Sequence, residues 1–200
     1  AGPDAILIPK VEQAAHIQSV AQHLQSAGSQ AQIWAMIETP LAIVNIAEIA
    51  RSATQLPLGC LVVGTNDLVK ETRATLDSGR AAALYWLSAI VTAGRAYEID
   101  VLDGVYNNFS DLSGFERECQ QGRMFGMDGK TLIHPSQIHG ANAVFTPSKD
   151  DVAWARKIIE AFEEPENKVK GVITLEGKMV ELLHAESARR TVAIAQAIGL

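Results

Sequence analysis

The chain has 200 residues, 48% of them hydrophobic and 20% charged, and a formal net charge of −6. This length and apolar content suit one domain with a sizeable core, and the negative charge argues against nucleic acid or an anionic membrane surface as the main partner. No apolar run reaches the roughly 20 residues that cross a bilayer, and the first residues do not have the pattern of a signal peptide. The two cysteines, Cys60 and Cys119, lie far apart and outside any metal-ligand spacing, which favours reduced thiols in a cytoplasmic protein.

Short apolar runs alternate with helical patterns along the first three quarters of the chain. The runs typical of strands are residues 4–10, 33–38, 61–67, 99–106 and 130–135. The helical patterns between and after them cover residues 11–27, 40–53, 75–98 and 111–122. Repeated strand–helix units predict an α/β fold with a parallel sheet.

The C-terminal quarter departs from this alternation. Residues 148–162 form an amphipathic helical pattern, and Ser148 with Asp151 three residues later is a capping-box-like start. Residues 168–181 read as a hairpin between two glycines, and a last helix is expected over 185–198. We therefore divide the chain into residues 1–147 and a C-terminal extension, 148–200.

Five strands do not close a (β/α)₈ barrel, which needs eight. The chain forms either an open doubly wound sheet, or a barrel whose first three strand–helix units are absent. Because the sequence begins abruptly on a strand, we favour the second interpretation.

Two apolar strands each end near a carboxylate, Glu38 after residues 33–37 and Asp67 after residues 61–66. Runs this apolar indicate strands buried on both faces. The carboxyl ends of parallel strands open onto one face, where the chemistry of such folds lies. No Arg or Lys adjoins either acid, so a hard cation, above all Mg²⁺, is the natural ligand. The alternative is that each acid caps the helix that follows it.

Short motifs also occur in the order and spacing of a known family. They are Ile8-Pro9-Lys10, Ile37-Glu38-Thr39-Pro40, Gly64-Thr65-Asn66-Asp67-Leu68, Asp103-Gly104-Val105 and Gly129-Lys130-Thr131-Leu132-Ile133-His134-Pro135-Ser136-Gln137. From about residue 5 to its end the chain resembles the citrate lyase β-subunit family, which includes malyl-CoA and citramalyl-CoA lyases among the Mg²⁺-dependent aldolases. The resemblance implies a TIM (β/α)₈ barrel of which strands four to eight are present, with the extension packing on the barrel or on a neighbouring subunit.

The resemblance further implies a Mg²⁺-dependent C–C lyase of a hydroxyacyl-CoA thioester, such as malyl-CoA, citramalyl-CoA or a citryl thioester. The products would be an acyl thioester and an α-keto acid. Coenzyme A enters as part of the substrate, and a cytoplasmic homo-oligomer, a trimer or hexamer, is expected, with no nucleic-acid or membrane partner.

Several residues are assigned to the site on the basis of this resemblance. Glu38 and Asp67 are the expected metal ligands, and Asp103 is a candidate catalytic acid, with a structural acid that holds a basic partner as the alternative. Lys10 is expected either to pair with Glu38 or to attract an acidic substrate. The candidate substrate-binding residues are Lys10, Thr39, Pro40, Gly64, His134 and Pro135. For His134 a hydrogen-bonded core histidine is the competing interpretation.

Glu181 is the candidate acid/base residue of the extension. Relatives often carry Asp-x-Pro in this stretch, whereas this chain has Gly177-Lys178-Met179-Val180-Glu181-Leu182-Leu183, with glutamate for aspartate and no proline. A longer carboxylate can still transfer a proton, but its reach shifts by one methylene, and misplacement near 1 Å can cost about 10²-fold in rate.

Two other functions remain open from the sequence. One is an aldolase of free 4-hydroxy-2-keto acids that uses no coenzyme A. The other is a non-catalytic paralogue that binds an acyl thioester without cleaving it.

Overall fold

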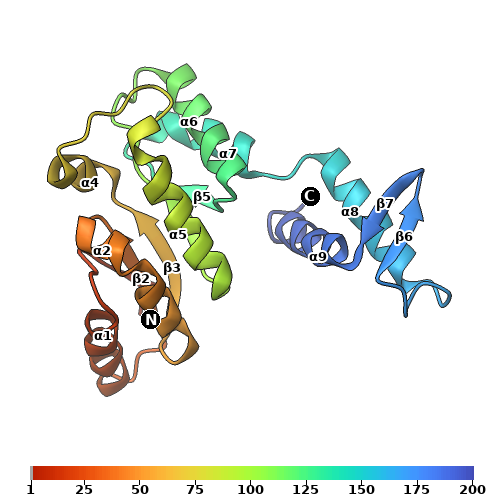
Figure 1. Ribbon diagram of the computed structural model, residues 1–200, viewed down its shortest axis with the longest axis horizontal. Coiled ribbons are helices and arrows are strands. Elements are labelled where there is room, and N and C mark those ends of the chain that lie inside the picture. The colour runs from red at the N-terminus through yellow and green to blue at the C-terminus, as the bar shows by residue number, and fades with distance from the viewer. Residues whose placement is uncertain (1) are drawn as a thin grey trace. The chain divides into compact units, whose positions relative to one another are not determined.

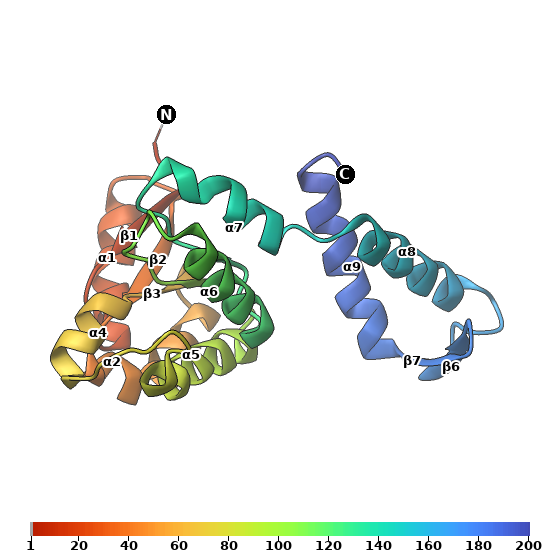
Figure 2. The ribbon, with the colours of Figure 1, turned by 90° about the horizontal axis from the view of Figure 1, so that it is seen from above.

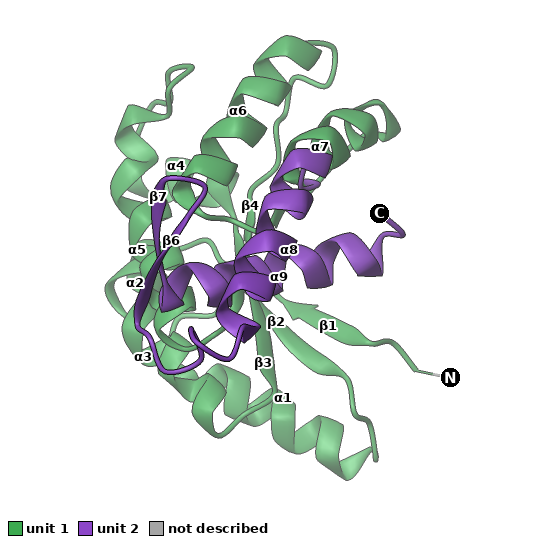
Figure 3. Cartoon of the chain, turned by 90° about the vertical axis from the view of Figure 1, so that its right-hand side faces the viewer, with its two compact units in different colours: residues 1–145 green, residues 146–200 purple. Residues whose placement is uncertain are grey.

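The computed structural model describes residues 2–200, which form two compact units, residues 2–145 and 146–200. Figure 3 colours the two units separately. The division falls two residues before the boundary expected from the sequence. None of the described helices is long and apolar enough to cross a membrane.

The first unit is built on a five-stranded parallel sheet in which the strands pair in chain order (Figure 1). Its strands are β1 (Ala5–Ile8), β2 (Gln32–Ile37), β3 (Leu58–Val63), β4 (Asp100–Asp103) and β5 (Gly129–Lys130). Its α-helices are α1 (Ala14–Ser26), α2 (Pro40–Val44), α3 (Ile46–Arg51), α4 (Thr65–Thr72), α5 (Leu84–Ala96), α6 (Leu112–Phe125) and α7 (Ile138–Phe145). The predicted α/β class and parallel sheet are confirmed, and sequential pairing is the strand order of a (β/α) barrel rather than of a doubly wound sheet.

The main core lies between one face of the sheet and the helices. Ile33, Ala35 and Ile37 of β2 are buried in it with Leu61 of β3 and Ile90 of α5. The alternate residues of β2, Trp34 and Met36, are only half-buried, so the expectation of burial on both faces is wrong for β2. It is right for the end of β3, where residues 60–63 are all buried. Figure 2, in which the molecule is seen from above, also shows α5 and α6 beside the sheet.

Several predicted elements are shorter than expected, and for three of them the structure gives a local reason. The helix predicted over 40–53 breaks at Asn45, whose side-chain amide donates to the Glu12 carbonyl at 2.9 Å, and a short 3₁₀ turn, Ser52–Thr54, follows α3. The helix predicted over 75–98 begins only with a 3₁₀ turn, Ala81–Ala83, because Arg80 adopts a left-handed conformation (φ 52°). The strand predicted over 130–135 ends at Lys130, and Pro135 opens another 3₁₀ turn, Pro135–Gln137.

The second unit contains α8 (Lys149–Glu163), a β-hairpin of β6 (Val172–Leu175) and β7 (Lys178–Glu181), and α9 (Leu182–Ala197). The capping box of α8 is present, since Ser148 Oγ accepts from the Asp151 N–H and Asp151 accepts from the Ser148 N–H. Ile158 and Phe162 of α8 pack against Ile173 and Val180 of the hairpin and Ala188 of α9. The predicted helix, hairpin and helix are therefore confirmed in order.

Both cysteines are free thiols in the interior of the first unit. Burial is the main cause that raises the pKa of Cys60 to about 12 and that of Cys119 to about 11. Thiols held protonated and out of solvent are poor nucleophiles and poor metal ligands, so neither is a candidate functional group.

Candidate metal and substrate site

Glu38 follows the last residue of β2 and is buried, with 5% of its surface exposed. Its Oε1 accepts a hydrogen bond of 2.8 Å from the backbone N–H of Lys10, a residue in the left-handed conformation (φ 49°) after β1. Burial raises the pKa of Glu38, the Lys10 N–H lowers it, and the Asp67 carboxylate raises it again. The net shift is upward, so the ionised carboxylate is not fully compensated.

Gly64, between β3 and α4, makes room for this side chain. A Cβ atom at Gly64 would lie 2.2 Å from Cβ and 2.9 Å from Oε2 of Glu38. No other residue fits at this close approach without displacing the acid. Gly64 therefore contributes to the site by its lack of a side chain, not by a polar group.

Asp67 lies in the first turn of α4, rather than at the end of a strand, and its side chain is 40% exposed. The Lys10 ammonium is 4.0 Å from Asp67 Oδ2 and 3.4 Å from Oε1 of Glu71, one turn further along α4. Three carboxylates, Glu38, Asp67 and Glu71, thus face one ammonium. The excess of negative charge is what a divalent cation would neutralise.

The predicted contact between Lys10 and Glu38 is made by the backbone of Lys10, and its ammonium turns to α4. The capping alternative for Glu38 is wrong, because the N-cap of α2 is Thr39, whose Oγ1 accepts from the Ala42 N–H at 3.1 Å. Thr39 is 2% exposed and Pro40 is the first residue of α2, so both shape the turn beside Glu38. Asp67 does not cap α4 either, because the N-cap is Gly64 and makes no side-chain cap hydrogen bond; the place of Asp67 in the first turn agrees only with a favourable interaction with the helix dipole.

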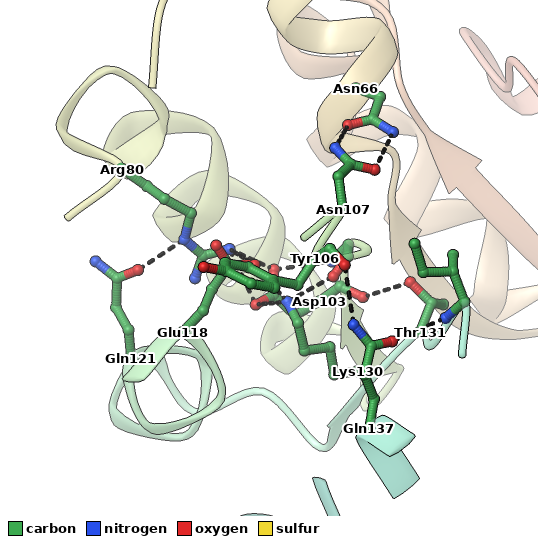
Figure 4. A network of polar contacts seen from close by, with 12 residues as sticks. Asn66, Arg80, Asp103, Tyr106, Asn107, Glu118, Gln121, Lys130, Thr131 and Gln137 are labelled. Atoms are coloured by element: carbon green, nitrogen blue, oxygen red, sulfur yellow. Dashed lines mark hydrogen bonds and ion pairs between the residues drawn. The ribbon is translucent and has the colours of Figure 1, made fainter. Parts of the chain in front are cut away.

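Asp103, the last residue of β4, lies in a different and fully buried environment (Figure 4). Arg80 Nη1 donates to both of its carboxylate oxygens, at 2.8 and 3.0 Å, and Lys130 Nζ donates to Oδ2 at 3.0 Å. Lys130 also binds Glu118 Oε1 at 2.6 Å. Two cations and two carboxylates balance here, which favours the structural interpretation of Asp103 over a catalytic one.

The Asp103 cluster, formed by Arg80, Asp103, Glu118 and Lys130, also fixes the turn after β4. The Gly104 N–H donates to Asp103 Oδ1 at 2.8 Å, and the Gly104 carbonyl accepts from Lys130 Nζ at 2.6 Å. A Cβ at Gly104 would lie 2.0 Å from Oγ1 of Thr65, the first residue of α4. Sequence reasoning missed Arg80, because it is 23 residues from Asp103 along the chain.

A cavity of about 350 Å³ lies between this turn, the start of α4 and α6. Its lining includes Thr65 Oγ1 and Arg80 Nη2, two buried polar atoms without a hydrogen-bond partner among the described residues. Asp77, Asp111 and Glu118 also line it. This mixture of donors and acids has no clear charge preference, and an ordered water would satisfy both orphan donors.

His134 and Pro135 are exposed, at the turn that leads into α7. The His134 ring stacks on Phe109 with centroids 4.7 Å apart, and its Nδ1 lies 2.8 Å from Ser136 Oγ. A core histidine is therefore wrong for this position. The ring presents its remaining edge to solvent, and its use in substrate binding stays a prediction.

Glu181 ends β7 in the second unit and is half-buried. Its backbone N–H donates to Nδ1 of His184 at 2.8 Å, which closes the first turn of α9. Its carboxylate belongs to a different unit from Glu38 and Asp67, and its role as an acid/base group also stays a prediction.

Among the residues that the structure describes, no group of three or more His, Cys, Asp or Glu side chains is arranged to hold a metal. The candidate cation site within the first unit is the pair Glu38–Asp67, with Lys10 and Gly64 around it. Two protein carboxylates suit Mg²⁺, which usually keeps several waters or substrate oxygens as its other ligands.

A family model described as HpcH/HpaI aldolase/citrate lyase matches residues 1–135. The chain belongs to this family. The resemblance read from the short motifs is thereby confirmed.

Curated relatives of the family are similar over nearly the whole chain. The (3S)-malyl-CoA thioesterase of Cereibacter sphaeroides is 46% identical over 98% of the chain, which covers 66% of that protein. The citrate lyase subunit beta of Leuconostoc mesenteroides is 32% identical, with 98% and 67% covered, and the human mitochondrial citramalyl-CoA lyase is 29% identical, with 98% and 61% covered. The chain thus spans about two thirds of the length of these relatives.

Solved structures of the family have the same fold. The protein CitE from Mycobacterium tuberculosis, solved with magnesium, acetoacetate and coenzyme A, is 29% identical, with a TM-score of 0.70 over 95% of this chain and 68% of that one. A citrate lyase from Burkholderia xenovorans, 19% identical, reaches a TM-score of 0.78 over 98% and 65% and supports the fold.

Proposed function

We propose that the chain is part of a Mg²⁺-dependent carbon–carbon lyase of a hydroxyacyl-CoA thioester. The observation that carries the proposal is the pair Glu38–Asp67, two carboxylates on neighbouring strand–helix junctions whose charge a single exposed ammonium does not balance. Membership of the HpcH/HpaI family and the magnesium and coenzyme A in the CitE structure support it. The substrates expected are malyl-CoA, citramalyl-CoA or a citryl thioester.

The reaction needs three changes in the substrate. The hydroxyl proton leaves, the bond between the hydroxyl-bearing carbon and the α-carbon breaks, and its electron pair passes to the thioester as an enolate. The enolate then takes a proton at carbon, which gives the acyl thioester and the α-keto acid. Bound Mg²⁺ would supply Lewis acidity and a template for the keto-acid carboxylate and adjacent oxygen.

The residues of this chain have separate tasks in the proposal. Glu38 and Asp67 hold the cation, and the Lys10 N–H keeps Glu38 in place. The Lys10 ammonium, half-exposed beside Asp67, attracts the acidic substrate. His134, stacked on Phe109, offers a ring edge on the exposed turn before α7 for the coenzyme A side of the substrate. Glu181 remains the candidate that protonates the enolate.

Thioester hydrolysis is the second candidate, because the Cereibacter relative at 46% identity is a (3S)-malyl-CoA thioesterase. In that reaction water adds to the thioester carbonyl, the C–S bond breaks, and the departing thiolate takes a proton. The products are a hydroxy acid and free coenzyme A, and no carbon–carbon bond is cleaved. The same cation site could orient the acid end of the substrate in both reactions.

One assay separates these activities. The protein is incubated with malyl-CoA, citramalyl-CoA or a free 4-hydroxy-2-keto acid, with Mg²⁺ or with EDTA, while released keto acid and released thiol are followed separately. Keto acid with no thiol supports the lyase, thiol with no keto acid supports the thioesterase, and turnover of the free acids alone supports the coenzyme A-independent aldolase. Mg²⁺ binding by calorimetry without any turnover would instead support the non-catalytic paralogue.

We also propose a cytoplasmic homo-oligomer, a trimer or hexamer, in which residues 146–200 dock on the barrel or on a neighbouring subunit. The exposed apolar side chains of Met179, Leu182 and Leu183 in the second unit support this assignment. Light scattering of the purified protein tests it, and a monomer would refute it.

A further inference from the structure

The loop after β4, residues 104–108, is hydrogen-bonded at one end to the Asp103 cluster and, through Asn107, to the start of α4, the helix that carries Asp67 (Figure 4). We propose that Asn107 is a positioning residue for the cation site. Its amide pair with Asn66 holds the first turn of α4 so that the Asp67 carboxylate can share a cation with Glu38. The inference rests on the proposed metal site and assigns a task to residues outside it.

The contact between Asn66 and Asn107 is reciprocal. Asn107 Nδ2 donates to Asn66 Oδ1 at 2.7 Å, and Asn66 Nδ2 donates to Asn107 Oδ1 at 3.1 Å. Each amide therefore uses one donor and its acceptor on the other, an arrangement that fixes both the distance and the orientation of the two side chains. Since Asn66 directly precedes Asp67, the pair holds the backbone of the metal-binding turn.

Asn107 can act as a brace because the loop behind it is held at several points. The buried Asp103 and Lys130 bind the N–H and the carbonyl of Gly104. The Tyr106 carbonyl accepts from Gln137 Nε2 at 2.9 Å, and its hydroxyl donates to Asp111 Oδ2 at 2.9 Å. Asn107 thus extends from an anchored loop towards Asn66, an exposed residue in the first turn of α4.

Repulsion between Glu38 and Asp67 is the reason why the start of α4 needs a contact that holds it in place. When Glu38 and Asp67 are both ionised, their repulsion favours a wider separation of α4 from β2. The Lys10 ammonium, at 4.0 Å and half-exposed, opposes this repulsion only weakly. The close packing of Gly104 on Thr65 limits movement on one side, and the amide pair adds a directional contact one residue from the ligand.

The test compares Asn107→Ala with Asn108→Ala. Asn108 is the adjacent asparagine and is also exposed, and none of the hydrogen bonds found among the described residues involves its side chain. Mg²⁺ affinity is measured by calorimetry on the full chain, and thermal unfolding is recorded for the same samples without metal. We expect Asn107→Ala to weaken Mg²⁺ binding about three- to tenfold, the usual range for one or two lost hydrogen bonds, and Asn108→Ala to leave it unchanged.

A double-mutant cycle makes the assignment specific to the pair. Asn66→Ala should weaken binding as much as Asn107→Ala, and the double variant should be no weaker than either, because all three lose the same contact. The midpoint of unfolding should be the same for Asn107→Ala and Asn108→Ala, since the pair is on the surface.

Two results would overturn the positioning role while the metal site stands: equal Mg²⁺ affinity in Asn107→Ala and Asn108→Ala, or a weaker affinity in Asn107→Ala accompanied by a lower unfolding midpoint than that of Asn108→Ala. The second result would mean general loosening of the loop. Failure of the metal site itself looks different, because then wild-type protein and Glu38→Gln would both bind no Mg²⁺, and both proposals fall.

Discussion

Two acids at the carboxyl ends of β2 and β4, the strands on either side of β3, have opposite surroundings in this protein. Asp103, at the end of β4, is completely buried and is held by Arg80 and Lys130. Glu38, at the end of β2, is nearly as buried, but its partners are a backbone N–H and a second carboxylate. Position at the carboxyl edge of a parallel sheet is therefore not enough to make an acid functional.

The difference lies in the charge that each acid meets. In the Asp103 cluster, two cations balance two carboxylates, and the hydrogen bonds of Asp103 are satisfied within the protein. At the Glu38–Asp67 pair, three carboxylates including Glu71 face one half-exposed ammonium. The first arrangement is balanced in charge without a ligand, whereas the second is favourable only when further positive charge arrives.

The largest expected difference between the two sites is in the free energy of unfolding after one acid of each is replaced by alanine. Asp103→Ala leaves Arg80 and Lys130 buried without their shared carboxylate, so we expect the free energy of unfolding to fall by about 3–5 kcal/mol. Asp67→Ala removes a half-exposed acid that repels Glu38, so its unfolding free energy should change by less than about 1 kcal/mol. Urea unfolding of both variants checks this, and equal losses would show that the contrast between the sites is false.

Glu38→Gln should produce the next largest effect, on metal binding rather than on stability. Loss of partners outside the ligand sphere commonly costs 10–100-fold in metal affinity, so loss of one of two charged ligands should cost at least about 10²-fold. The neutral amide also removes the repulsion with Asp67, so the unfolding midpoint without metal should be unchanged or higher. Calorimetric Mg²⁺ titration with a parallel thermal melt tests both parts, and Glu48→Gln, on an exposed face of α3, is the matched control. Tight Mg²⁺ binding by Glu38→Gln would remove Glu38 from the site.

The sequence predicted the order of the sheet elements and located the acids near the ends of β2 and β3, because both depend on local patterns. Apolar runs located β2 and β3, and the short motifs placed Glu38 and Asp67 near their ends. Thr39 as the cap of α2 could have been read from the same sequence, since a threonine directly before proline is a usual helix start.

What the sequence could not supply is which charges meet across the fold. Arg80 reaches Asp103 from a loop that interrupts a strongly helical pattern, and Lys130 reaches it from β5, 27 residues away. Lys10 was a reasonable partner for Glu38, yet its left-handed backbone directs the N–H to Glu38 and the ammonium to α4. These pairings follow from tertiary packing, and no spacing in the chain encodes them.

The raised pKa of Glu38 predicts a pH dependence of both stability and Mg²⁺ affinity. Burial and the Asp67 carboxylate make the folded protein hold the Glu38 proton more tightly than the unfolded chain does. The stabilisation from that proton is therefore present below the ordinary carboxyl pKa and is lost as the pH rises through the raised value. Mg²⁺ must displace the proton, so its affinity should fall as the pH is lowered through the same window, by at most about tenfold per pH unit for one proton.

Calorimetry in buffers of different ionisation enthalpy counts the protons released on Mg²⁺ binding. Wild-type protein should release up to one proton at the acidic end of this window, and Glu38→Gln should release fewer. A proton count that is unaffected by Glu38→Gln would assign the titration to another group.

Lys10→Met should have the smallest effect, and it tests directly how charge is balanced at the Glu38–Asp67 pair. The Lys10 ammonium lies 4.0 Å from Asp67 and 3.4 Å from Glu71, on the surface, where such contacts are worth about 0.2–1 kcal/mol. An ammonium at this place competes with an incoming cation, so its loss should tighten Mg²⁺ binding about 1.4- to fivefold. The backbone N–H that holds Glu38 is retained in this variant. Lys70→Met serves as the control for lost surface charge, because Lys70 is an exposed residue of α4 and takes part in none of the ion pairs found among the described residues. If Lys10→Met weakens Mg²⁺ binding instead, the ammonium stabilises the geometry of the site more than it repels the cation. The Glu38–Asp67 pair would then resemble the Asp103 cluster, in which protein cations already hold the carboxylates in place.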